Sequence, residues 1–114
     1  AESYPPVSKM KLLLCNNPFY RIPMDKQFTF HFHSMGDQSG INWHGDKGYE
    51  YGITYYINHR WNPYWGGEFM YEDDHFGYFP VQGNSLIILK APVKHKVSPV
   101  LKPNIPRMTI QAFI

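Results

Sequence analysis

Apolar and polar residues alternate along much of the chain, and this period of two is typical of β-strands. The clearest example covers residues 27–33, where Phe28, Phe30 and Phe32 share one face of the predicted strand. The other face carries Gln27, Thr29, His31 and His33. A polar strand face either meets solvent or lines the wet interior of a barrel, and both interpretations stay open at this point.

Similar patterns predict about eight short strands, separated by segments rich in Gly, Pro and Asn. In residues 85–89, Ser85 is followed by a continuous apolar run, which predicts a strand buried on both faces. Residues 36–40, 47–48 and 77–83 are predicted turns. No sustained i, i+3, i+4 pattern is present, so no helix is predicted. The predicted strands are residues 9–14, 27–33, 41–46, 50–58, 67–72, 85–89, 95–100 and 107–113.

Composition supports a β-rich fold. Aromatic residues make up 18% of the 114 positions, and Gly and Pro contribute 9 and 10 residues. Aromatic side chains favour strands, and frequent Gly and Pro mark turns. A chain of this length forms one domain. We therefore predict a single all-β or β-dominated domain of residues 1–114, a jelly roll or small barrel, with its core in 27–114 and an irregular, short-strand lead-in at 1–26.

Charge and cysteine content exclude several classes of protein. The net charge of +2 with neutral histidines argues against nucleic-acid binding. The single cysteine, Cys15, excludes an internal disulfide framework and a multi-cysteine zinc site. No apolar run reaches the ~18 residues of a membrane span, and no secretory signal pattern is visible. The sequence therefore predicts a cytoplasmic protein that takes no membrane partner.

Two histidines and an aspartate predict a metal site. His44 and Asp46 stand two positions apart, so on a strand both side chains project to the same face. His95, which follows the apolar run 85–89, is the candidate third ligand. Two histidines and one carboxylate form the facial triad of non-haem Fe(II) oxygenases, which leaves metal positions open for cosubstrate, O₂ or water.

The chain around these residues resembles the Fe(II)/2-oxoglutarate-dependent oxygenases, specifically the prolyl-4-hydroxylase-like group. The resemblance covers roughly residues 28–114, and its segments follow the order of the family at about the family's spacings. These segments are Trp43–Asp46, Tyr55–Asn58, Trp61, Trp65–Glu68, Pro80–Leu86, His95–Val100 and Arg107–Ile110.

The resemblance implies a double-stranded β-helix, which is a jelly-roll barrel. It implies Fe(II) held by His44, Asp46 and His95, with 2-oxoglutarate and O₂ as cosubstrates. The implied reaction hydroxylates a C–H bond of a peptidyl substrate, such as a prolyl residue, or of a small molecule, and releases succinate and CO₂. No catalytic residue is implied beyond the three metal ligands.

Four further residues are implied to bind 2-oxoglutarate. Arg107 opens the last predicted strand, and its planar guanidinium suits a carboxylate. Thr109 is two positions further on the same face, and this Arg-x-Thr resembles the Arg-x-Ser of the family. Tyr56 matches a tyrosine that in relatives contacts the same carboxylate. His33 stands where some relatives place another cosubstrate-contacting tyrosine.

Lys102 competes with Arg107 for the distal carboxylate, because some prolyl-hydroxylase relatives use a lysine there. Lys102 precedes Pro103, however, which predicts a loop outside the barrel. Arg107 begins an alternating strand, so we predict that Arg107 binds the carboxylate.

Other functions stay open at the level of sequence. His31, His33 and Asp37 loosely resemble the His-x-His plus carboxylate of cupins, which would make the chain a metal-binding or small-molecule-binding module. A jelly-roll interaction domain without turnover is a further alternative.

Members of the oxygenase family that the chain resembles usually cover one sheet with N-terminal helices. Because the lead-in predicts no helix, we expect either a homodimer or a missing N-terminal segment.

Overall fold

A computed structural model gives the fold and describes residues 5–16, 22 and 27–114. Within these residues the chain forms one α-helix, one short 3₁₀ helix and eight strands. The elements are α1 (Pro5–Cys15), β1 (Thr29–Met35), β2 (Ile41–His44), β3 (Tyr51–Tyr56), η1 (Pro63–Trp65), β4 (Phe69–Glu72), β5 (Phe76–Phe79), β6 (Leu86–Lys90), β7 (Lys94–Val97) and β8 (Arg107–Phe113).

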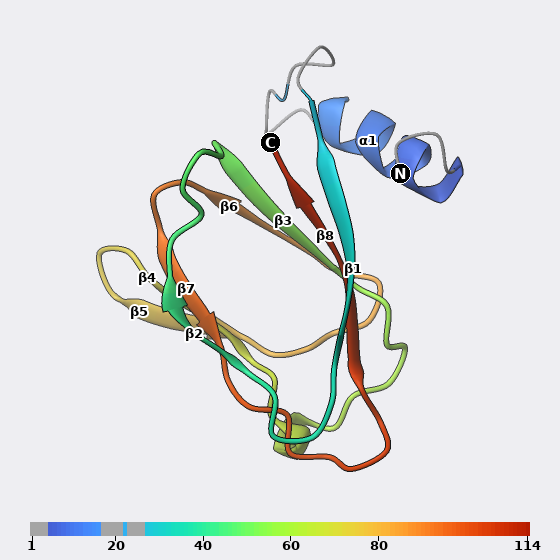
Figure 1. The fold of residues 1–114 in the computed structure, drawn as a ribbon, viewed down its shortest axis with the longest axis vertical. Coiled ribbons are helices and arrows are strands. Elements are labelled where there is room, and N and C mark those ends of the chain that lie inside the picture. The colour runs from blue at the N-terminus through green and yellow to red at the C-terminus, as the bar shows by residue number, and fades with distance from the viewer. Residues whose placement is uncertain (1–4, 17–21, 23–26) are drawn as a thin grey trace.

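The strands form two antiparallel sheets of four strands each, in the orders β1-β8-β3-β6 and β2-β7-β4-β5. Figure 1 shows the two sheets facing each other, with α1 beside β1 on the outer side of the first sheet. Successive strands alternate between the sheets through most of the chain. This arrangement is a jelly roll, so the predicted β-dominated double-stranded β-helix is confirmed.

The register of the first sheet decides where the polar face of β1 points. β1 pairs with β8 from Thr29 opposite Phe113 to Met35 opposite Arg107. In that register His33 stands opposite Thr109, and its side chain lines the cavity between the sheets. Of the two interpretations of this polar face, the one in which it lines the barrel interior holds at His33. His31 on the same strand is exposed.

The predicted strand at residues 9–14 is wrong, because these residues belong to α1. Met10 and Leu14 stand one helical turn apart, and both pack on the outer face of the first sheet. Leu14 is 2% exposed and joins a cluster that includes Phe28 and Ile53. A run this short is ambiguous between strand and helix, and the contact with the sheet favours the helix. The break predicted after it falls partly on 17–18, outside the described residues.

The turn predicted at residues 77–83 is wrong in its first half, because residues 77–79 belong to strand β5. β5 pairs with β4 from Phe69 opposite Phe79 to Glu72 opposite Phe76. The glycine that suggested a turn, Gly77, sits opposite Tyr71, and a Cβ at Gly77 would lie 2.4 Å from the Tyr71 ring. Gly77 is therefore a place where a cross-strand aromatic ring approaches the backbone closely.

The prediction that residues 85–89 are buried on both faces is also wrong in part. Ile87 is buried between the sheets, but Leu86 on the opposite face is 44% exposed. Phe32, on the same outer face of the first sheet, is 61% exposed. Helix α1 thus covers only part of this face, and the homodimer stays a prediction. No helix within the described part of the chain has the length and apolar character needed to cross a membrane.

Candidate metal centre and cosubstrate pocket

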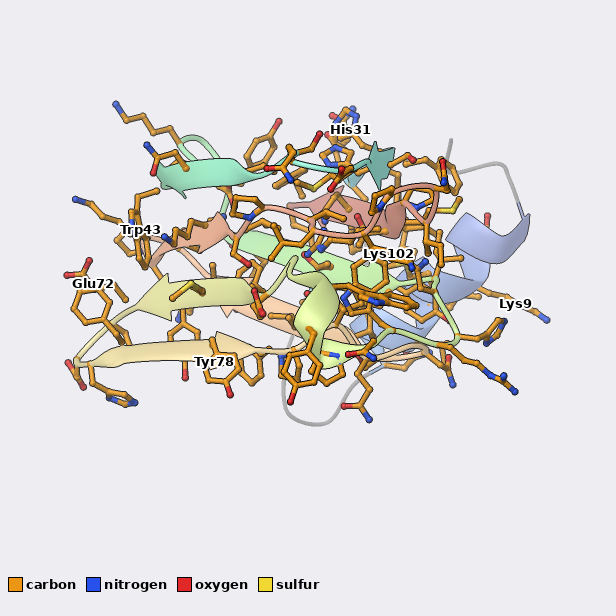
Figure 2. The ribbon with its side chains drawn as sticks, turned by 90° about the horizontal axis from the view of Figure 1, so that it is seen from below. Lys9, His31, Trp43, Glu72, Tyr78 and Lys102 are labelled. Atoms are coloured by element: carbon orange, nitrogen blue, oxygen red, sulfur yellow. The ribbon has the colours of Figure 1, made fainter. Side chains whose placement is uncertain are left out.

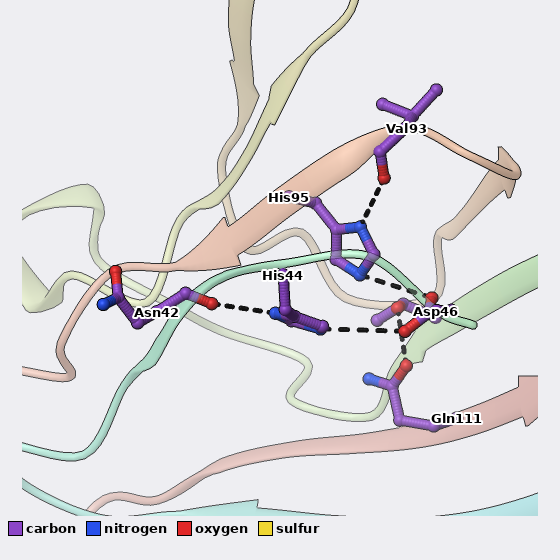
Figure 3. Close-up of polar contacts among 7 residues, drawn as sticks. Asn42, His44, Asp46, Val93, His95 and Gln111 are labelled. Carbon is purple, nitrogen blue, oxygen red and sulfur yellow. Dashed lines mark hydrogen bonds and ion pairs between the residues drawn. The ribbon is translucent and has the colours of Figure 1, made fainter.

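Three predicted metal ligands meet where β2 ends. β2 pairs with β7 so that His44 stands directly opposite His95, and their ring centroids are 4.3 Å apart. Asp46 follows β2 and turns its carboxylate toward both rings (Figure 3). Asp46 Oδ1 lies 3.7 Å from His44 Nε2, and Asp46 Oδ2 lies 3.3 Å from His95 Nε2. One donor atom from each residue lies within 4.8 Å of the other two.

Backbone carbonyls orient both imidazoles. His44 Nδ1 is 2.8 Å from the Asn42 carbonyl oxygen, and His95 Nδ1 is 2.9 Å from the Val93 carbonyl oxygen. A carbonyl oxygen only accepts hydrogen bonds, so each Nδ1 carries the proton and donates it. In the neutral imidazole, each Nε2 then turns its lone pair toward Asp46. This is the arrangement in which outer hydrogen bonds orient histidine ligands for a metal.

The three donors fit a divalent cation. Two imidazole nitrogens and one carboxylate direct lone pairs into the same space, which is unfavourable unless a cation occupies it. The set of two histidines and one carboxylate suits Fe(II). Within the described ranges no other three His, Cys, Asp or Glu side chains come this close together. In particular, the cupin-like set of His31, His33 and Asp37 is not assembled as a metal site.

Neighbouring residues hold the centre in place. The ring of Phe69 stacks on His95 at 5.3 Å between centroids and 17° between planes. Gly52 on β3 leaves room for the carboxylate, because a Cβ there would lie 2.8 Å from Asp46 Oδ2. His95 is 6% exposed, whereas the His44 side chain is 37% exposed. The centre is thus supported from the sheet side and open to solvent beside His44.

A cavity between the sheets joins the metal centre to Arg107. His33 from β1 also lines this cavity. Thr54, Gln111 and Phe113 line it as well and were not predicted as site residues. For Gln111 and Phe113 the sequence does hold a signal, since both share the Arg107 face of the alternating strand 107–113.

Arg107 is a buried cation, 1% exposed. Its Nε donates to the Gly67 carbonyl oxygen at 2.9 Å, and its Nη2 donates to Tyr56 Oη at 3.2 Å. No carboxylate of the described residues lies within the 4.0 Å ion-pair distance of its guanidinium. Burial lowers the pKa of Arg107, and Tyr56 opposes this shift. Burial likewise raises the pKa of Tyr56, against the opposing effect of Arg107.

Thr109 and His33 adjoin this cation. Thr109 is fully buried on β8, opposite His33 on one side and Tyr56 on the other. The pKa of His33 is lowered, first by burial and then by the neighbouring charges of His31 and Arg107. The structure thus brings the four predicted cosubstrate residues together on the inner face of the first sheet.

Lys102 lies elsewhere. It belongs to the loop between β7 and β8, where its Nζ is 5.4 Å from the centroid of the Trp65 ring (Figure 2). It does not line the cavity. The position of Lys102 therefore agrees with the predicted loop outside the barrel and leaves Arg107 as the cation at the closed end.

Several solved structures share this fold. A prolyl-4-hydroxylase from Pseudomonas putida is 18% identical with a TM-score of 0.72, and the match covers 94% of this chain and 60% of that one. A 2OG-Fe(II) oxygenase family oxidoreductase from Burkholderia pseudomallei is 18% identical with a TM-score of 0.67, covering 95% and 57%. A prolyl 4-hydroxylase from Phytophthora capsici is 15% identical with a TM-score of 0.68, covering 92% and 38%.

The chain therefore spans 60% or less of the length of these three proteins. No curated protein sequence matches it significantly. Residues 30–114, which include all eight strands except the first residue of β1, match the sequence family described as the 2OG-Fe(II) oxygenase superfamily. On this match over most of its length, the chain belongs to the 2OG-Fe(II) oxygenase superfamily.

Proposed function

We propose that this chain is an Fe(II)- and 2-oxoglutarate-dependent dioxygenase that hydroxylates a C–H bond and releases succinate and CO₂. One observation carries the proposal. A single cavity joins three convergent metal-ligating side chains to Arg107, a buried cation without a carboxylate partner among the described residues. An elongated dianion that ligates a metal at one end and pairs with a cation at the other fits such a cavity.

At the open end, His44, Asp46 and His95 would hold Fe(II). In the neutral rings, the hydrogen bonds of both Nδ1 atoms to backbone carbonyls place the proton on Nδ1 and direct the Nε2 lone pairs at the ion. When bound, Fe(II) supplies the O₂ chemistry that couples oxidative decarboxylation of the cosubstrate to hydroxylation of an unactivated C–H bond. These three side chains would hold the ion and would leave its other positions for cosubstrate and O₂.

At the closed end, Arg107 would bind the distal carboxylate of 2-oxoglutarate. A buried charge is costly unless it is paired, so this guanidinium favours an anionic ligand. Tyr56 Oη accepts a hydrogen bond from Arg107 Nη2, which leaves the Tyr56 hydroxyl proton free to donate. The cation and the donated proton suit a carboxylate, because an ionised carboxylate only accepts.

His33 and Thr109 complete the proposed carboxylate site. His33 on β1 stands directly opposite Thr109 on β8, and Thr109 also stands opposite Tyr56 on β3. The lowered pKa of His33 keeps its imidazole neutral near pH 7, so it offers one donor and one acceptor. His33 thereby contributes a hydrogen bond without placing a second positive charge beside Arg107.

For the substrate we propose a peptidyl or small-molecule C–H bond, with prolyl residues as the first candidates. Two of the structurally similar proteins are named prolyl 4-hydroxylases. The exposed flank of His44 gives a substrate access to the metal from solvent.

Succinate release tests the proposal. The wild-type chain is incubated with Fe(II), 2-oxoglutarate and O₂ against proline-containing peptides, free amino acids and small metabolites. We expect at least one candidate to stimulate succinate release and to gain one oxygen atom by mass spectrometry. His95→Ala should abolish both signals, because it removes the most buried metal ligand. Succinate release that persists unchanged in His95→Ala would contradict the proposal.

A further inference from the structure

Two polar side chains in the cavity take no part in the contacts proposed above. Thr54 on β3 is 4% exposed, and it stands directly opposite Gln111 on β8. The Thr54 hydroxyl donates to Gln111 Oε1 at 2.9 Å, and Gln111 Nε2 donates to Thr109 Oγ1 at 3.1 Å. Thr54, Gln111 and Thr109 thus form a continuous relay of hydrogen bonds that ends beside Arg107.

This line of hydrogen bonds has a direction. A threonine hydroxyl has one proton to donate, and Thr54 donates this proton to Gln111 Oε1. The amide nitrogen of Gln111 is thereby turned toward Thr109. Because Thr109 Oγ1 accepts from that nitrogen, its own proton is left to donate elsewhere. If the Gln111 amide were turned the other way, Thr109 would donate its proton to the carbonyl oxygen of Gln111.

We propose that Thr54 and Gln111 are positioning residues that set the Thr109 hydroxyl as a donor to the distal carboxylate of 2-oxoglutarate. The inference rests on the proposed function, because it concerns the same cosubstrate. An ionised carboxylate has no proton to give, so it binds best where every facing group is a donor. Tyr56 and Arg107 already meet this condition, and the relay adds the Thr109 hydroxyl to these donors.

The relay also reaches the metal end of the cavity. Figure 3 shows Gln111 rising from β8 toward Asp46, and both residues line the same cavity. Because Gln111 lines the same cavity as Asp46 and Arg107, a substitution at Gln111 can alter either end of that cavity. A loss of metal affinity and a loss of carboxylate affinity must therefore be measured separately.

Calorimetric titration of the Mn(II)-loaded chain separates the two effects. Each variant is titrated with 2-oxoglutarate and with 2-oxopentanoate, which has a methyl group in place of the distal carboxylate. Thr54→Val removes the donated proton and keeps the shape of the side chain, whereas Thr54→Ser keeps the hydroxyl. Gln111→Met breaks the relay at its centre. Thr29→Val, on a strand position outside the cavity, is the matched control.

We expect Thr54→Val and Gln111→Met to weaken 2-oxoglutarate binding about threefold to tenfold, the effect of one hydrogen bond. Binding of 2-oxopentanoate and of Mn(II) should stay within about twofold of wild type, because neither presents a carboxylate to Thr109. Thr54→Ser should restore 2-oxoglutarate affinity, and Thr29→Val should leave it unchanged.

Each contrary result has a separate meaning. If Thr54→Val and Gln111→Met weaken both oxo acids equally, or neither, the relay does not set the donor and the inference is overturned. Equal loss in Thr54→Ser and Thr54→Val would show that packing, not the hydroxyl, matters at this position. If the wild-type chain binds no 2-oxoglutarate, the proposed function itself fails and the relay fails with it.

Discussion

Replacing Arg107 with Met separates the binding role of this residue from its role in stability. The substitution removes the charge and keeps most of the side-chain volume. Arg107 is 1% exposed, so a carboxylate bound to it forms an ion pair shielded from water. Truncating one partner of such a pair costs about 2–5 kcal/mol. At about 1.4 kcal/mol per tenfold, 2-oxoglutarate affinity should fall roughly 30-fold to several thousand-fold.

Stability without ligand should respond in a different way. In that state the guanidinium has no carboxylate partner among the described residues, and burial lowers its pKa. Removing this buried charge relieves its desolvation cost, which offsets the loss of its hydrogen bonds to the Gly67 carbonyl oxygen and to Tyr56. We therefore expect the free energy of unfolding of Arg107→Met to stay within about 1 kcal/mol of wild type or to rise.

Two measurements check this prediction. Calorimetry of the Mn(II)-loaded chain gives the 2-oxoglutarate affinity, and urea unfolding without ligand gives the stability. Lys102→Met is the matched control, because it removes a cation from the surface loop beside Trp65. Wild-type affinity in Arg107→Met, or a comparable loss in Lys102→Met, would refute the assignment of the carboxylate site.

Three further predictions follow from single residues. Gly52→Ala should lower Mn(II) affinity at least about tenfold with the fold retained, because its Cβ would lie 2.8 Å from Asp46 Oδ2; near-wild-type affinity by calorimetry would contradict this. His33 has a folded-state pKa below its ordinary 6.5, so it contributes stability above pH 6.5 that is lost as the pH falls through the lowered pKa. His33→Gln should therefore lose less stability in acid than wild type, measured by urea unfolding on both sides of that pH. Leu14→Ala should cost about 2–5 kcal/mol in the same assay with Mn(II) affinity unchanged, because the side chain packs α1 on the sheet far from the metal.

Local patterns in the sequence predict most of the strands and the candidate ligand set. Alternation locates β1 and β8, because a strand between core and cavity needs one apolar and one polar face. The spacing of His44 and Asp46 places both on one side of the chain by the same geometry. The position of the candidate third ligand, His95, depends on the pairing of β2 with β7, and its selection from the sequence rests on the family resemblance.

The predictions from sequence are wrong or incomplete where a contact between distant segments decides the local structure. Residues 9–14 are helical because Leu14 finds a site on the outer face of the first sheet, which the local run does not reveal. Gly77 resembles a turn residue until Tyr71 is placed opposite it. The hydrogen bond of Thr54 to Gln111 likewise depends on the register between β3 and β8.

Sequential binding of metal and cosubstrate tests whether the three candidate ligands and Arg107 form one functional site. Under anaerobic conditions, the chain is titrated with Fe(II) and then with 2-oxoglutarate, and the heat of each step is recorded. We expect one Fe(II) and then one 2-oxoglutarate per chain, with both steps lost in Asp46→Ala and only the second lost in Arg107→Met. Fe(II) binding that survives in Asp46→Ala, or 2-oxoglutarate binding that needs neither the metal nor Arg107, would contradict this expectation.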